Sequence, residues 1–67
     1  MNVPLAQITH AMEEAEDKAW EALSGYKFWM FGYHAAKWVQ LNQLLPRTTR
    51  RASPFADLVK TARGRIP

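Results

Sequence analysis

Most aromatic residues of this chain lie in one short segment, residues 26–38, and this segment constrains the fold more than any other feature. It contains Tyr26, Phe28, Trp29, Phe31, Tyr33 and Trp38. Aromatic side chains bury large areas and dominate the energetics of cores and interfaces. A chain of 67 residues has too little interior to bury all of them. Part of the segment is therefore expected to contact a partner.

Apolar residues recur every three or four positions in the first third of the chain, which predicts an amphipathic helix over about residues 4–24. This apolar stripe consists of Leu5, Ile8, Met12, Ala15, Ala19 and Ala22 or Leu23. Pro4 suits the start of a helix. Gly25 suits the left-handed residue that follows a helix, so we expect Gly25 to adopt that conformation and the chain to turn back there.

A second helix is predicted over about residues 26–45, because the residue before Pro46 avoids helical geometry. Its apolar residues fall on two sides. One side carries Phe28, Phe31, Ala35, Trp38, Val39 and Leu45, and the other carries Tyr26, Trp29, Met30, Tyr33, Leu41 and Leu44. The first helix can cover only one side when the two form an antiparallel hairpin. The second side is left for the third helix, another subunit or a different molecule, and we assign its residues to partner binding.

Gly32 lies inside this second helix, where glycine costs about 1 kcal/mol relative to alanine. Together with Ala35 and Ala36 it forms a patch of small residues. The patch indicates close packing against a helix or against the ring of Trp29 or Trp38.

Residues 46–53 have no apolar period and predict a basic linker. Ser53 then suits an N-cap and Pro54 the first position of a short third helix over about residues 54–63. Helical spacing places its apolar residues at Phe55, Leu58, Val59 and Ala62. Since about ten residues do not form a stable helix alone in water, this helix must dock or stay mobile. Residues 1–67 are thus predicted to form one small all-α domain.

Composition excludes several classes of protein. The chain has no cysteine, so disulfides and thiolate metal sites are ruled out. The longest apolar stretch contains Lys27 and Lys37, which are costly inside a bilayer, and the sequence lacks the pattern of a signal peptide. We expect a soluble, cytoplasmic protein.

No constellation of residues points to an enzyme. His10 has Glu13 and Glu14 nearby, but a metal site needs three or four converging ligands, and His34 is expected to be hydrogen-bonded at the edge of the core. Glu16 is expected either to pair with a cation such as Lys37 or to lie at the rim. The glycines are isolated from one another, so no phosphate loop is present. We expect no catalytic residue, cofactor or metal.

Basic residues concentrate after Pro46. The set comprises Arg47, Arg50, Arg51, Lys60, Arg63 and Arg65. Such a cluster is typical of contact with nucleic acid or with an acidic protein surface, and it can also serve solubility alone. These arginines do not alternate with aromatic rings as in a single-strand binding platform.

The block KFWMFGYHAAKWVQLN at residues 27–42 resembles segments of small uncharacterised proteins encoded by bacteriophages and prophages. The resemblance covers about a quarter of the chain and implies a bacterial or viral setting and a protein that acts by binding. It assigns no activity to any residue.

These patterns predict a helical interaction protein that self-associates through an aromatic face and binds a macromolecular partner, as a phage-type regulator or inhibitor of a host complex would. Two alternatives stay open at this point. One is a nucleic-acid accessory protein that uses the basic C-terminal segment, and the other is a peripheral membrane protein whose aromatic face enters the lipid interface.

Overall fold

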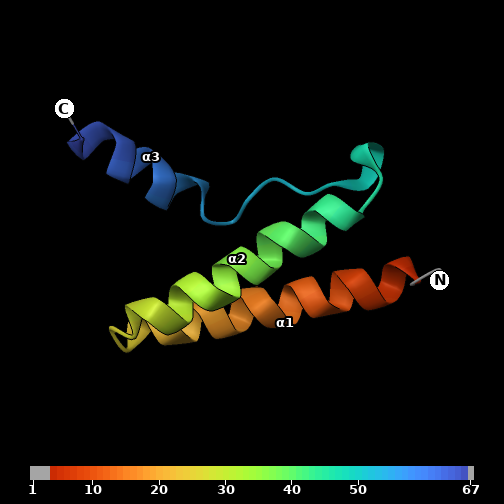
Figure 1. Cartoon of the computed structure of the whole chain (residues 1–67), viewed down its shortest axis with the longest axis horizontal. Coiled ribbons are helices and arrows are strands. Elements are labelled where there is room, and N and C mark those ends of the chain that lie inside the picture. The colour runs from red at the N-terminus through yellow and green to blue at the C-terminus, as the bar shows by residue number, and fades with distance from the viewer. Residues whose placement is uncertain (1–3, 67) are drawn as a thin grey trace.

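The computed structural model describes residues 4–66, and this part of the chain is all helical, with no strand (Figure 1). Its elements are α1 (Leu5–Ser24), α2 (Phe28–Leu44), a 3₁₀ turn η1 (Arg47–Thr49) and α3 (Ala56–Arg65). Helices α1 and α2 pack side by side as an antiparallel hairpin. The predicted hairpin with a short C-terminal helix is confirmed.

The core lies along the seam between α1 and α2. Helix α1 buries the predicted stripe at Ile8, Met12, Ala15, Ala19 and Ala22, but Leu5, which was also assigned to the stripe, is half exposed at the start of the helix. Three of the five buried residues are alanines, and their small side chains allow α2 to approach closely. Trp38, Leu45 and Phe55 complete the buried cluster, with Phe31, Ala35 and Leu41 packed partly against it.

The turn between α1 and α2 corrects the prediction for Gly25. Gly25 has a φ of −97°, whereas Tyr26 has a φ of +62°. The N–H of Lys27 donates to the Ala22 carbonyl at 2.9 Å, and the N–H of Tyr26 donates to the Leu23 carbonyl at 3.0 Å. This pair of bonds is the Schellman motif, in which the left-handed position is usually glycine. Here the motif begins one residue later than expected, and a tyrosine occupies its left-handed position.

After α2 the chain runs back along the hairpin as a strap, which we define as residues 46–55 (Figure 1). Leu45 is extended, with a ψ of 149°, as expected for a residue before proline. The Arg50 guanidinium donates to the carbonyls of Leu45 and Gln43 at 3.1 and 3.0 Å. These bonds satisfy carbonyls that the end of α2 leaves without helical partners.

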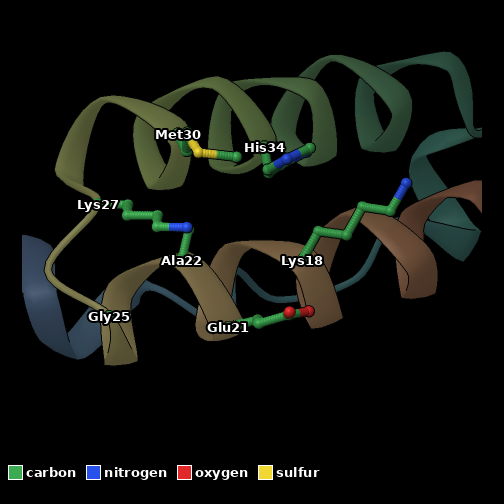
Figure 2. Close-up of a pocket in the computed structure, with 7 residues that line it drawn as sticks. All are labelled: Lys18, Glu21, Ala22, Gly25, Lys27, Met30 and His34. Carbon is green, nitrogen blue, oxygen red and sulfur yellow. The ribbon is translucent and has the colours of Figure 1, made fainter.

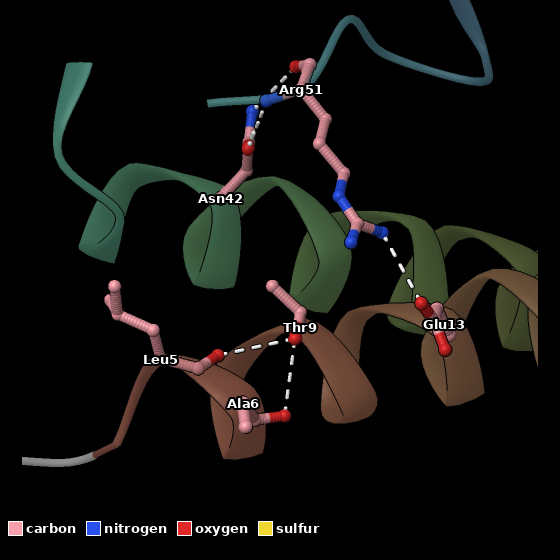
Figure 3. Close-up of polar contacts among 6 residues, drawn as sticks. All are labelled: Leu5, Ala6, Thr9, Glu13, Asn42 and Arg51. Atoms are coloured by element: carbon pink, nitrogen blue, oxygen red, sulfur yellow. Dashed lines mark hydrogen bonds and ion pairs between the residues drawn. The ribbon is translucent and has the colours of Figure 1, made fainter. Parts of the chain in front are cut away.

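Two further contacts hold the middle of the strap. Asn42 of α2 donates from Nδ2 to the Arg51 carbonyl and accepts from the Arg51 N–H, both at 2.9 Å. The Arg51 side chain extends across to α1, where its guanidinium lies 3.5 Å from Glu13 (Figure 3). The predicted linker is therefore a segment with defined contacts to both helices.

Phe55 anchors the end of the strap. Its ring packs against Trp20, Phe31 and Trp38, with centroid separations of 5.1, 5.4 and 6.2 Å. The N-cap of α3 is Phe55 rather than the predicted Ser53, and α3 begins at Ala56, two residues later than predicted. The Ser53 hydroxyl instead accepts the Phe55 N–H at 3.1 Å, in the turn that precedes the helix. Within the described chain, α3 buries none of its own side chains, so Phe55 joins this helix to the core.

The two predicted sides of α2 are correct only in part. Trp38 and Leu45 are buried as expected, but Phe28 and Val39, assigned to the same side, are exposed. Phe28 and Val39 are eleven residues apart, which places them on the same strip of α2, and their exposure shows that α1 does not cover this strip. On the other side, Met30 and Leu41 are half-buried rather than exposed. No helix within residues 4–66 combines the length and the apolar character that crossing a bilayer requires.

Candidate interaction surface

Four aromatic side chains at the turn and in the first half of α2 point into solvent. The exposed fractions are 81% for Tyr26, 61% for Phe28, 79% for Trp29 and 63% for Tyr33. We call these four residues the outer aromatic surface. The rings of Tyr26 and Phe28 also contact each other edge to face, with centroids 6.0 Å apart.

The predicted partner-binding set divides between this surface and the hairpin. Tyr26, Trp29 and Tyr33 belong to the surface, while Met30 and Leu41 turn towards α1 and the core. Leu44 is exposed but lies at the opposite end of α2. Phe28 was not predicted as part of this surface, because the helical wheel placed it on the side of Phe31 and Trp38, which α1 was expected to cover.

A patch of small residues adjoins the outer aromatic surface. Gly32 and Ala36 are exposed, one turn apart on α2, and among the described residues nothing lies within 4 Å of the position that a Gly32 Cβ would occupy. Further along α2 lies a shallow hollow of about 370 Å³, which is lined by Tyr33, Ala36, Lys37 and Gln40. The predicted close packing at Gly32 is therefore wrong within a single chain.

Charge is separated between the two helices. Five of the six acidic residues lie on α1, and α2 has none. Four of them, Glu13, Glu14, Asp17 and Glu21, are exposed on α1. Glu14 lies 3.6 Å from Lys18 and 3.8 Å from His10. The segment of residues 26–38, which carries the outer aromatic surface, has no acidic residue, and its lysines are Lys27 and Lys37.

A second hollow, of about 430 Å³, lies between the turn ends of α1 and α2. It is lined by Lys18, Glu21, Ala22, Gly25, Lys27, Met30 and His34 (Figure 2). Met30 and His34 lie on the side of α2 that faces α1, and the Lys27 side chain lies between the two helices near Ala22, whereas Glu21 lies on the far edge of α1 in this view. The buried Nδ1 of His34 has no hydrogen-bond partner among residues 4–66, so the expected hydrogen bond is absent at this atom.

The predicted basic set also divides into two groups. Arg50 caps α2 and Arg51 pairs with Glu13, so both have roles in the fold. All six residues are exposed, but the guanidinium groups of Arg50 and Arg51 are engaged in these contacts with the hairpin.

The remaining polar candidates have local roles. Glu16 accepts a hydrogen bond from the Trp20 indole Nε1 at 3.0 Å, rather than pairing with Lys37. In the part of the chain that the structure describes, no group of three or more histidine, aspartate and glutamate residues is placed to hold a metal ion.

Comparison of this chain with protein-family models, curated proteins and solved structures finds no match. The surface itself must therefore carry any functional argument.

Proposed function

We propose that the chain is a non-enzymatic helical interaction protein that self-associates through its outer aromatic surface and, once assembled, binds a macromolecular partner. The observation that carries this proposal is the exposure of four aromatic side chains, Tyr26, Phe28, Trp29 and Tyr33, at one end of the hairpin. Exposed apolar surface on this scale marks interaction sites in soluble proteins.

The area available supports an interface of ordinary size. A buried aromatic side chain removes about 150–250 Å² from water, so covering four largely exposed ones removes roughly 500 Å² per copy. A standard interface buries about 800 Å² per partner. The small residues and polar neighbours of α2 supply the rest, and aromatic residues are the side chains that most often dominate binding energy.

The helix that carries most of the aromatic surface is packed on one side and fixed at its C-terminal end. Trp38 and the α1 stripe fix α2 from one side, and the strap fixes its C-terminal end through Asn42 and Arg50. The surface is therefore held on a packed helix, which reduces the entropy lost on binding. The same contacts use Arg50 and Arg51, and this weakens the alternative of a continuous basic site for nucleic acid.

Sedimentation velocity over the micromolar range tests the proposal. We expect a dimer or larger species for the unmodified chain and a shift towards monomer for Trp29→Ala and Tyr33→Ala. Leu44→Ala is the matched control, because Leu44 is also exposed but lies outside the outer aromatic surface. A strict monomer at all concentrations, or equal effects of all three changes, would contradict the proposal.

Two binding assays separate the alternatives. We expect the chain to stay with the aqueous fraction when mixed with anionic phospholipid vesicles, and to show little retention on duplex DNA at low salt. Cosedimentation with vesicles that Trp29→Ala abolishes would instead assign the surface to lipid. Retention on DNA that falls steeply with salt would favour the basic residues as the functional site.

A further inference from the structure

We infer that the partner of the outer face of α2 is the same face of a second copy, packed antiparallel about a two-fold axis that passes between Gly32 and Tyr33. This inference rests on the proposed function and specifies its first step, the self-association. It names the register in which the two α2 helices meet.

The outer face of α2 carries both a protruding ring and a place to receive one. Trp29 is 79% exposed, and Gly32 and Ala36 leave open space one and two turns further along the same helix. A two-fold interface uses the same patch on both copies, so the patch must complement itself. A surface with a large ring at one end and small residues at the other meets this condition.

The proposed axis brings these features together. With the axis between residues 32 and 33, Trp29 of one copy lies level with Ala36 of the other, and each Gly32 lies level with Tyr33, one residue from its own equivalent. Two helices can then approach closely at the glycines, since a side chain at this point would separate them. The glycine lowers helix propensity, and among residues 4–66 no other part of the fold crowds the position that its Cβ would occupy, whereas the close approach of a second copy gives it a role.

The ring and the small residues select the antiparallel arrangement over the parallel one. In a parallel pair, with the two-fold axis along the helices, Trp29 lies level with its own equivalent, and Gly32 and Ala36 lie level with theirs. The two protruding rings then meet each other and leave the small residues uncovered. The antiparallel pair instead brings the ring of one copy to the small residues of the other.

The rest of the described chain leaves this face open. Helix α1 covers the side of α2 that carries Trp38, and Phe55 of the strap packs against the neighbouring Phe31 and Trp20. The residues of the outer face are all exposed: Trp29, Gly32, Tyr33, Ala36 and Gln40. A second hairpin can therefore approach without displacing α1 or the strap.

Single-cysteine crosslinking tests the register, and the absence of native cysteine makes the experiment clean. A disulfide requires Cα atoms about 4.4–6.8 Å apart. The variants Gly32→Cys, Ala36→Cys and Gln40→Cys place the thiol at successive turns of the same face. Under mild oxidation we expect Gly32→Cys to form a disulfide dimer at least tenfold faster than Gln40→Cys, with Ala36→Cys also slow.

A mixed experiment covers the case in which a side chain at position 32 itself disturbs the interface. Equal amounts of Trp29→Cys and Ala36→Cys should form the heterodimeric disulfide in preference to either homodimer. Two results with the single variants would argue against the register: fastest crosslinking at Ala36→Cys, or equal rates at all three positions. Either result, combined with no preference for the heterodimer in the mixture, would overturn it. The unmodified chain would still sediment as a dimer in that case, so the proposed function would stand; a monomer would overturn both.

Discussion

Phe55, the last residue before α3, packs its ring against Trp20 of α1 with their centroids 5.1 Å apart. This contact joins two residues that are far apart in the sequence, and the Trp20 indole is itself oriented by its hydrogen bond to Glu16. The ring of Phe55 is buried, while α3 beyond it is exposed. The attachment of the C-terminal helix therefore depends on one side chain.

Phe55→Ala should lower the free energy of unfolding by about 3 kcal/mol, within the range found when a buried aromatic ring is removed. It should also release α3, so amide hydrogens of residues 56–65 should exchange faster. Chemical denaturation and hydrogen exchange measure the two effects. Phe28→Ala is the control, since Phe28 is mostly exposed and its loss should change the stability of the dilute monomer little. Equal effects of the two changes would contradict the anchoring role.

Tyr26→Gly should raise the free energy of unfolding by about 1 kcal/mol. Tyr26 has a φ of +62°, and a left-handed conformation costs a non-glycine residue about 1–2 kcal/mol, which exceeds the extra entropy of glycine in the unfolded chain. Thermal unfolding at concentrations that keep the chain monomeric measures the difference.

Gly25→Ala serves as the control for the turn. The added Cβ would meet its nearest atom at 3.8 Å, an ordinary contact, and Gly25 has a negative φ. We therefore expect a change below about 0.5 kcal/mol, as for most substitutions away from special backbone positions. The opposite result would be a large loss of stability for Gly25→Ala and no gain for Tyr26→Gly. That result would place the left-handed conformation at Gly25 instead.

Asn42→Ala should destabilise the chain by about 1–2 kcal/mol, because it leaves the Arg51 N–H and carbonyl without their two side-chain bonds. Arg51→Gln preserves those backbone bonds and removes only the ion pair with Glu13, whose side chains are 45% and 62% exposed. An exposed pair of this kind contributes at most about 1 kcal/mol. Urea unfolding should therefore show a larger loss of unfolding free energy for Asn42→Ala than for Arg51→Gln. An equally large loss for Arg51→Gln would show instead that the ion pair holds the strap.

The helices of this fold were predictable from sequence because local patterns determine them. The α1 stripe from Ile8 to Ala22 repeats at helical spacing, and Pro46 ends α2 by its effect on the preceding residue. The strap was not predictable, since the bonds from Asn42 to Arg51 and from Arg50 to the end of α2 join residues that no periodicity relates. The same limit applies to Phe55, whose neighbours come from two helices.

The candidate site was predictable as a segment but not residue by residue. The density of rings between residues 26 and 38 indicated that some must stay exposed, and Trp29 and Tyr33 are exposed. Met30 and Leu41 turn inward because α1 spans more of the α2 circumference than a two-sided wheel suggests. The left-handed Tyr26 was missed because glycine is the usual residue at that position and Gly25 precedes it directly.

Sedimentation equilibrium of Gly32→Leu beside the unmodified chain tests the central claim most directly. In one chain the position is open and leucine is a better helix former than glycine by about 0.7 kcal/mol or more, so the dilute variant should unfold at a higher temperature. At the α2 face, the added side chain blocks the close approach of a second copy. The account predicts a dimer for the unmodified chain and a more stable monomer for Gly32→Leu; a variant that associates as tightly as the unmodified chain would contradict it.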